Sequence, residues 1–496
     1  MSRDLREWLE EVEANDLLER IDAEVDWDEE MAAITYMRHR ERDAPALLFE
    51  NVRGYPDDYR VLFNMFSSSS ARLALTMNES PDASDLELIR HAREKLSASV
   101  DPEYVAPDSA SVYENTQTGE DVDVTKFPAP KMWPKDGGRY IGTADATIHR
   151  DPETGILNVG TYRQMIQGKR EVGLYTSPGK DLRIDMQHQW ERDEPLEVAA
   201  VYGVLPELFV AGSMSPSKDE SELHHAGGIR GSPIEVVEGS ATDLPIPAHA
   251  EIVVEGKLYP NDMKPEGPFG EFTGYYGRPK DDTPVLSIEA VHHRDRPILT
   301  SSLMADYPGN DATYFYGLGR SAGIWNDIED KLGIPGVTGV YCPPASMGVG
   351  MTFVSVDQQY AGHASQVASI AAQCPNGAYF SKFIVVVDDD IDVTDIDQVL
   401  WAMSTRANPE DDLDTLTDTW STWLDPAQNP PEERPYGSKV LVDATKNHQH
   451  YDEFAERSAL HEATYRHVAD RWAEYGFDDE PPELPMLVED DELRLN

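Results

Sequence analysis

From about residue 111 to residue 303 the chain consists of short β-rich runs separated by glycine, proline and aspartate. The runs are ADATIHR, ILNVGTYRQMI, GLYTS, VAAVYGVL, AEIVVEG and VLSIEAVHHR. Many short strands at this spacing, with few helical stretches between them, are typical of an antiparallel barrel or sandwich. The sequence therefore predicts a middle domain, residues 111–304, that is built on such a β-structure.

Helical patterns and one buried strand precede this segment. Apolar residues at helical spacing predict a helix over residues 2–20, capped by Ser2, and a second helix over residues 82–97. The run APALLFEN, residues 44–51, reads as a buried strand that enters a turn. Residues 100–108 resemble a linker, so we expect an N-terminal α/β domain over residues 1–110.

Beyond Ala305 helical and strand-like patterns alternate. GLGRSAGIWNDIEDKLG and AGHASQVASIAAQC predict helices, whereas MTFVSVD and FIVVVDDDID predict strands. This alternation indicates an α/β domain with a mainly parallel sheet over residues 305–445. A helical tail, residues 446–496, follows, and we expect it to pack on a neighbour within the chain or across a dimer. The predicted fold class is α+β, with several domains.

The net charge of the chain limits the kinds of molecule that it can bind and indicates the salt conditions to which it is adapted. Asp and Glu number 92 and Lys and Arg 42, which gives a formal net charge of −50. Such a polyanion repels nucleic acid and anionic lipid, so we expect neither as a partner. Acidic residues spread along the whole chain suit a surface that stays hydrated in concentrated salt, as in a halophilic archaeon. Only two cysteines, and no apolar run near the about 18 residues of a membrane span, indicate a cytoplasmic protein.

Two glutamates flank a bend in the sequence Glu266-Gly-Pro-Phe-Gly-Glu271. The bend can bring both carboxylates toward one cavity, where repulsion and burial raise the pKa of one acid enough for it to donate a proton. The alternative is a surface turn with two solvated glutamates. Spacing alone leaves both possibilities open.

Two further segments contain polar residues suited to ligands. In LNVGTYR, Asn158 offers an amide oxygen, and Arg163 offers a planar fork that pairs with a carboxylate. In the serine-rich segment that follows Ser213, Glu222 is suited to a hard cation such as Mg²⁺ or Mn²⁺. The adjacent His224 and His225 face opposite ways if the chain is extended, so they make a poor joint metal site. The alternative is that Asn158 lies in a turn, Arg163 is an ordinary strand residue and Glu222 is a solvated acid.

Taken together, these segments resemble the UbiD family of decarboxylases. The resemblance rests on six motifs in order: LNVGTYR (157–163), SELHHAGGIRGSPIEVV (221–237), PAHAEIVVEG (247–256), EGPFGEFTGYY (266–276), SKFIVVVDDDID (381–392) and GSKVLVDAT (437–445). Each motif alone is weak, but six in this order and at this spacing are specific. The resemblance extends over most of the chain, from about Leu5 to Thr445.

The resemblance implies a reversible, non-oxidative decarboxylase that uses prenylated flavin mononucleotide (prenylated FMN). It implies a split β-barrel like that of flavin reductases between an N-terminal α/β domain and a C-terminal α/β domain that mediates oligomerisation. We therefore expect a homodimer or homohexamer, and a flavin prenyltransferase as the supplier of the cofactor. A divalent cation, Mn²⁺ or Mg²⁺, would join the flavin phosphate to the protein beside a K⁺ ion.

The same resemblance assigns roles to individual residues. The family's catalytic Glu-Arg-Glu network falls on Glu266, Arg163 and Glu271, with Glu271 protonating the carbon that loses CO₂. The metal ligands would be Asn158, Asp181 and Glu222. The cofactor-binding residues would be Thr161, Tyr162, Arg163, Lys180, Met214, Ser215 and Lys382, of which Lys382 matches a lysine that meets the phosphate.

One metal ligand departs from the family pattern. The family usually has a histidine about 23 residues after the asparagine, where this chain reads Ser177-Pro-Gly-Lys-Asp181. A carboxylate at Asp181 could still hold Mn²⁺ or Mg²⁺. A shifted alignment offers His188 instead, and a plain solvated acid at Asp181 is the third possibility.

The implied substrates are aromatic or α,β-unsaturated carboxylic acids, because members of the family act on these. A menaquinone precursor and an unsaturated phosphorylated acid of isoprenoid synthesis are comparable options, and the sequence does not choose between them. The alternative function is a catalytically silent flavin-binding module of the same fold.

Overall fold

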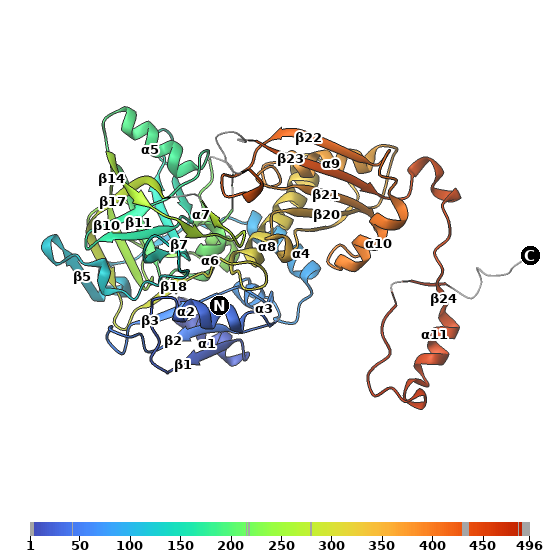
Figure 1. Cartoon of the computed structure of the whole chain (residues 1–496), viewed down its shortest axis with the longest axis horizontal. Coiled ribbons are helices and arrows are strands. Elements are labelled where there is room, and N and C mark those ends of the chain that lie inside the picture. Colours follow the sequence, from blue (N-terminus) through green and yellow to red (C-terminus); the bar gives the residue numbers. More distant parts are fainter. Residues whose placement is uncertain are drawn as a thin grey trace, which may run out of the picture.

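The computed structural model describes residues 4–41, 43–214, 216, 219–277, 280–428, 436–484 and 486–488. The fold is a mixed α+β arrangement in which three sheets meet around a group of central helices, as expected (Figure 1). No helix in these ranges is long and apolar enough to cross a membrane. Cys342 and Cys374 are both buried and unpaired.

The N-terminal part contains four helices and three strands of one sheet. The elements are α1 (Leu5–Ala14), β1 (Leu18–Ile21), α2 (Glu30–Arg38), β2 (Ala46–Phe49), β3 (Arg60–Phe63), α3 (Ala71–Thr76) and α4 (Asp85–Ser97). The sheet order is β1-β2-β3-β18, and β18 (Ile298–Ser301) returns from far along the chain to pair in parallel with β3. The N-terminal sheet is therefore completed by a strand that follows the central domain.

The prediction of one helix over residues 2–20 is wrong. The helix begins after Asp4, whose side chain accepts hydrogen bonds from the backbone N–H groups of Arg6 and Glu7, and it ends at Ala14. Asp16 then takes a left-handed φ of 59°, which breaks the helix. Residues 18–21 pair with β2 as a strand instead. The predicted cap, Ser2, lies outside the described residues.

The central sheet has nine strands, and all neighbouring strands in it are antiparallel. Its order is β6-β9-β10-β17-β14-β11-β7-β8, with β5 paired to β17. The strands are β5 (Asn115–Thr118), β6 (Tyr140–Gly142), β7 (Asp145–Arg150), β8 (Leu157–Gly160), β9 (Gln164–Gly168), β10 (Glu171–Leu174), β11 (Leu196–Tyr202), β14 (Ile252–Glu266) and β17 (Asp281–His293). The result is an open half-barrel in which β8 is an edge strand.

Short helices and small sheets surround the half-barrel. They are α5 (Asp181–Glu191), α6 (Pro206–Ala211), α7 (Glu222–Arg230), a sheet in which β12 lies between β13 (Pro245–Pro247) and β4, and the hairpin of β15 (Phe269–Gly270) and β16 (Tyr276–Gly277). The segment 100–108, which resembles a linker in sequence, contributes β4 (Glu103–Tyr104), and β4 pairs in parallel with β12 (Glu235–Glu238). This segment is therefore part of the folded body and not a free linker.

The C-terminal sheet has the order β19-β20-β21-β23-β22 and is mixed. Its elements are β19 (Val337–Tyr341), β20 (Met351–Val356), β21 (Phe383–Asp388), β22 (Leu413–Thr419) and β23 (Gly437–Ala444), together with α8 (Ala312–Asn326), α9 (His363–Gln373) and α10 (Ile396–Arg406). The inner strands β20, β21 and β23 are parallel, but the edge strands β19 and β22 are antiparallel to their neighbours. The prediction of a mainly parallel sheet is thus correct only for the inner strands.

The C-terminal tail contacts the body through Arg457, which lies over the Trp401 ring, but beyond this residue it stands away from the body of the molecule (Figure 1). It contains β24 (Leu460–His461), α11 (Glu462–Ala469) and β25 (Leu487–Val488), and no residue of α11 is buried. Trp472 stacks on Phe477 with the ring centroids 4.4 Å apart, inside the tail itself. Packing against the rest of the chain, one of the two predicted alternatives, is therefore not observed for α11.

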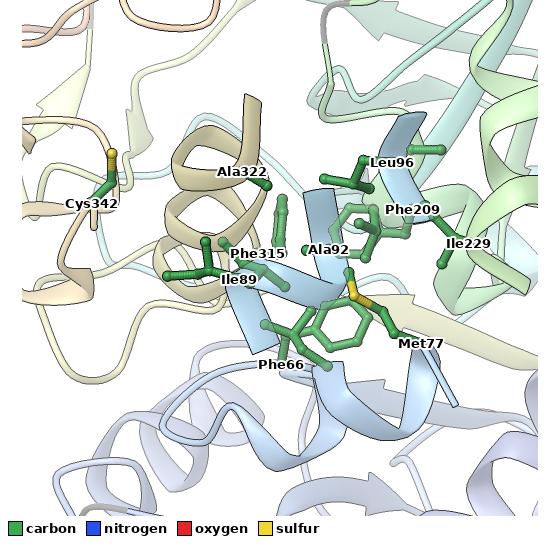
Figure 2. Close-up of a cluster of buried hydrophobic side chains, with 14 of the residues drawn as sticks. Phe66, Met77, Ile89, Ala92, Leu96, Phe209, Ile229, Phe315, Ala322 and Cys342 are labelled. Carbon is green, nitrogen blue, oxygen red and sulfur yellow. The ribbon is translucent and has the colours of Figure 1, made fainter. Parts of the chain in front are cut away.

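One cluster of buried apolar residues joins the three parts of the chain (Figure 2). In it α4 packs against α7 and α8, and Phe315 of α8 contacts Phe209 of α6 with the ring centroids 4.8 Å apart. Phe66, from the N-terminal part, contacts both of these rings. Because Leu96, Phe209 and Phe315 also line the large cavity described below, this core forms part of the cavity wall.

Candidate active site

Arg163 lies between two glutamates that are more than 100 positions away in the sequence. Its Nε and Nη2 donate to Glu266 Oε1 and Oε2 over 3.1 and 2.8 Å, and its Nη1 donates to Glu271 Oε1. Arg163 directly precedes β9, Glu266 ends β14, and Glu271 follows β15. The structure thus brings together the three residues that the sequence proposes as a catalytic network.

The bend between the two glutamates depends on glycine. Gly267 has a φ of +83°, a conformation that residues with a side chain rarely adopt. A Cβ on Gly270 would lie 2.1 Å from the Trp133 ring. The Gly-Pro-Phe-Gly sequence therefore allows the tight turn that points Glu266 and Glu271 at the same guanidinium.

The three charged side chains are almost fully buried. The exposed fractions of the Arg163, Glu266 and Glu271 side chains are 8, 3 and 6%. Burial raises the pKa of Glu271, Arg163 opposes this rise, and the neighbouring Glu266 adds to it. Burial therefore favours the protonated form of Glu271, which suits this carboxyl group to hold a proton.

Aromatic groups fix the guanidinium and one glutamate. The Arg163 guanidinium lies over the Tyr175 ring, 4.1 Å from its centroid. The Tyr140 hydroxyl donates a 2.6 Å hydrogen bond to Glu266 Oε1. Sequence reasoning missed both tyrosines, because a single aromatic residue in a β-rich segment carries no special signal.

A cavity of about 430 Å³ opens beside this network. Arg163 and Glu271 line it, together with a largely aromatic wall made of Tyr162, Tyr175, Phe209, Phe269, Phe272, Phe315, Tyr316, Tyr379 and Trp420. A cavity of this size, apolar with a few converging charged groups, is typical of a site for an organic cofactor and a small substrate.

A second group of polar residues lies along the same cavity, at the edge strand β8. Glu222, the first residue of α7, accepts hydrogen bonds from the Val159 N–H over 2.8 Å and from Asn158 Nδ2 over 3.2 Å. Burial raises the pKa of Glu222 to about 8, and the nearby charge of Asp181 contributes to this rise. Asp181 begins α5 and Glu222 begins α7, so each of these carboxyl groups lies at a helix N-terminus.

This second group fits a cation. Asn158 Oδ1 is buried and has no hydrogen-bond partner. A cation beside it would satisfy this oxygen, favour the ionised form of the buried Glu222 and offset the charge of Asp181. Among the described residues, no three His, Cys, Asp or Glu side chains are grouped closely enough to form a metal site by themselves. The amide oxygen of Asn158 would therefore be an essential ligand.

The predicted cofactor-binding residues fall in different places. Thr161, Tyr162, Lys180 and Met214 line the cavity, whereas Ser215 lies outside the described residues. Lys382 forms a 2.8 Å ion pair with the buried Asp425 and is not among the described residues that line the cavity. Arg320 of α8 does line it, and sequence reasoning missed this cation because only the fold brings α8 to the cavity.

Comparison with protein families identifies the chain. The model of the 3-octaprenyl-4-hydroxybenzoate carboxy-lyase N-terminal domain matches residues 9–92, that of the Rift-related domain matches residues 103–307, and that of the C-terminal domain matches residues 313–444. The chain belongs to the UbiD family. Since this family and its solved neighbours are carboxy-lyases, the chain is an enzyme of the decarboxylase type.

Relatives match over nearly the whole length of the chain. A protein of Aeropyrum pernix is 32% identical over 500 residues, which cover 96% of this chain and 99% of the relative. Vanillic acid decarboxylase of Sedimentibacter hydroxybenzoicus, in its closed form, has a TM-score of 0.84 and 27% identity, and the match covers 96% of this chain and 98% of that one.

A further solved relative contains a cofactor. An evolved dimeric form of the UbiD-class enzyme HmfF from Pelotomaculum thermopropionicum, in complex with prFMN, has a TM-score of 0.78 and 28% identity. The match covers 92% of this chain and 97% of that one. UbiD membership, predicted from the six motifs, is thus confirmed by family models and by structures.

Proposed function

We propose that this UbiD-family enzyme reversibly decarboxylates an aromatic or α,β-unsaturated carboxylic acid with prenylated FMN bound in the 430 Å³ cavity. The observation that carries the proposal is the buried Glu266–Arg163–Glu271 network, of which Arg163 and Glu271 line the cavity. The bound prenylated FMN supplies the electron sink that loss of CO₂ requires, because no side chain of the site offers one.

The protein's own part in the reaction is to hold and deliver a proton. Burial and Glu266 favour the protonated form of Glu271, and Arg163 fixes the position of its Oε1. Glu271 then donates this proton to the substrate carbon that has lost CO₂ and takes it back in the carboxylation direction. The aromatic wall excludes water, which keeps the proton on Glu271 until it is needed.

The residues at β8 would hold the phosphate end of the cofactor. Asn158, Asp181 and Glu222 would bind Mn²⁺ or Mg²⁺, with K⁺ beside it, and the cavity cations Lys180 and Arg320 suit a phosphate. Lys382 stays a predicted phosphate contact that would have to leave Asp425. The proposal also includes a flavin prenyltransferase as the supplier of the cofactor. We further propose that the protein forms a homodimer or homohexamer and works in the cytoplasm of a halophile.

The proposal is tested by loading the enzyme in two ways. The protein is produced with and without a coexpressed flavin prenyltransferase, and each preparation receives a panel of aromatic and α,β-unsaturated acids. We expect a bound-flavin absorbance spectrum that changes with coexpression, and CO₂ release by the coexpressed enzyme alone. Bound flavin in both preparations, with no CO₂ release from any acid, would instead support the silent flavin-binding module.

A further inference from the structure

A buried carboxyl group that the proposed reaction does not use lies in the wall of the same cavity. Asp145, the first residue of β7, is 1% exposed and lines the cavity of about 430 Å³. Ala146 and Ile148 belong to the cluster of buried apolar residues that joins the parts of the chain. Because successive side chains of a strand point to opposite faces, Asp145 and Thr147 point away from that cluster.

Polar side chains from three strands hold one oxygen of this carboxyl group. Thr147 Oγ1 and Gln164 Nε2 donate to Asp145 Oδ2 over 2.9 and 3.0 Å. The Tyr202 hydroxyl of β11 donates in turn to Gln164 Oε1 over 2.6 Å. All four side chains are buried, and of the four only Asp145 lines the cavity. The chain of hydrogen bonds therefore begins inside the central domain and ends at the cavity with Asp145.

The other oxygen of Asp145 is the one suited to a ligand. The Tyr162 N–H also donates to Oδ2, over 3.5 Å, so three neutral donors converge on Oδ2 and none of these bonds involves Oδ1. Burial raises the pKa of Asp145 to about 7, although these hydrogen bonds oppose the rise. Since Oδ2 already accepts three hydrogen bonds, a protonated Asp145 carries its hydrogen on Oδ1. Oδ1 can thus donate to a ligand or, when Asp145 is ionised, accept from one.

Asp145 lies near the part of the cavity that contains Glu271. Burial raises the pKa of the Tyr316 phenol to about 12, and the charges of Glu271 and Asp145 both add to this rise. Tyr316 itself lines the cavity. The two carboxyl groups therefore lie around the same aromatic side chain, where a ring system bound beside Glu271 comes within reach of Asp145.

We propose that Asp145 binds the cofactor through a hydrogen bond to the pyrimidine half of the flavin ring system. The inference rests on the proposed function, which places a flavin in this cavity. The pyrimidine half has the ring carbonyl groups and the ring N–H, whereas the dimethylbenzene half has no hydrogen-bonding group. Because a buried polar group is costly without a partner, Asp145 favours the orientation that brings the pyrimidine half to β7. Asp145 is therefore a cofactor-binding residue that also orients the flavin.

The test measures FMN binding to the full-length protein in the presence of Mn²⁺ and K⁺. Asp145→Leu removes both oxygens and keeps a side chain of similar shape. We expect this variant to bind FMN at least about tenfold more weakly than the wild type, with shifted absorbance bands of the bound flavin.

Tyr202→Phe is the matched control for this test. It removes the hydroxyl group at the far end of the same chain of hydrogen bonds, at a buried residue that does not line the cavity. We expect it to keep the wild-type FMN affinity and spectrum even if its stability falls. Wild-type affinity and spectrum in Asp145→Leu, or equal changes in both variants, would overturn the inference.

Asp145→Asn covers the case in which Asp145→Leu does not fold. Nuclear magnetic resonance of FMN labelled with ¹³C and ¹⁵N in the ring compares this variant with the wild type. We expect the signals of the pyrimidine half to shift and those of the dimethylbenzene half to stay, and unchanged pyrimidine signals would contradict the proposed hydrogen bond. A wild type that binds neither FMN nor the coexpressed prenylated cofactor would refute the proposed function as well. Equal FMN binding by the wild type and Asp145→Leu would refute only the role of Asp145.

Discussion

The Tyr140 hydroxyl and the Arg163 guanidinium donate to the same oxygen, Glu266 Oε1, over 2.6 and 3.1 Å. This shared acceptor links β6 to β9 through the end of β14. It also keeps Glu266 in a position where it acts on Arg163 rather than on the cavity, which leaves Glu271 as the carboxyl group of this network that lines the cavity.

Tyr140→Phe removes one of these two donors and keeps the ring against Phe269. We expect catalytic turnover to fall about tenfold, and stability to fall by roughly 1.5–3 kcal/mol, the range for a hydrogen bond to a charged group. Turnover of coexpressed enzyme and urea unfolding measure these effects. Tyr36→Phe, which removes a surface hydroxyl bonded to Asp306, is the control, and equal effects of both variants would contradict a role for Tyr140.

Arg163→Lys keeps the positive charge but loses the planar fork. A lysine cannot reproduce the paired donation to Glu266 together with the contact to Glu271, so the proton on Glu271 loses its fixed position. We expect turnover to fall at least about 100-fold, in the range attributed to a positioned general acid. Retention of wild-type turnover by a correctly folded, flavin-loaded variant would refute the positioning role.

The stability of the metal-free protein should depend on Glu222. The pKa of this carboxyl is about 8 in the folded chain against an ordinary value of 4.5, mainly because of burial. The folded state therefore binds more protons than the unfolded state between these values, and its stability falls as the pH rises from about 4.5 to 8. Thermal unfolding should show a weaker pH dependence for Glu222→Gln than for the wild type.

Mn²⁺ provides the control for this pH effect. Added at pH 8, it should raise the melting temperature of the wild type and leave Glu222→Gln nearly unchanged, because a ligand that binds only the folded state stabilises it. Identical pH slopes for the two proteins would argue against a buried, protonated Glu222.

Phe315→Ala tests the core that joins the parts of the chain. Phe315 is 1% exposed and contacts Phe66 and Phe209, which come from different parts (Figure 2). We expect a loss of about 3–5 kcal/mol in the free energy of unfolding. Leu332→Ala, at a residue that is 56% exposed, should cost well under 1 kcal/mol. A similar loss for both variants would show that this core does not hold the parts together.

Much of the fold was predictable from local patterns. The helix α4 forms near the predicted residues 82–97 because Ser84 and Glu87 make a reciprocal capping box, which is a local signal. The predicted helix over residues 2–20 fails for the opposite reason, since pairing with β2 overrides a helical spacing beyond Ala14. The antiparallel direction of the edge strands β19 and β22 could likewise not be predicted from the sequence, because the direction of a strand depends on how the chain connects it to the rest of the sheet.

The site was predictable only where the chain has a motif. Arg163, Glu266 and Glu271 belong to motifs that the UbiD resemblance interprets, and the structure brings them together. Tyr140 and Arg320 carry no local signal, because their neighbours in space come from distant elements. The departure at Asp181 was visible in the sequence, but its closeness to Glu222 became visible only in the fold.

The most direct test of the account is hydrogen–deuterium exchange at the substrate carbon. The decarboxylated product is incubated in D₂O with enzyme coexpressed with a flavin prenyltransferase, and deuterium incorporation is followed by NMR. We expect rapid exchange with the wild type and with Glu171→Gln, a surface control that pairs with Lys264. Glu271→Gln, with an unchanged flavin spectrum, should exchange at least about 100-fold more slowly. Exchange at the wild-type rate in this variant would contradict the assignment of Glu271 as the proton donor.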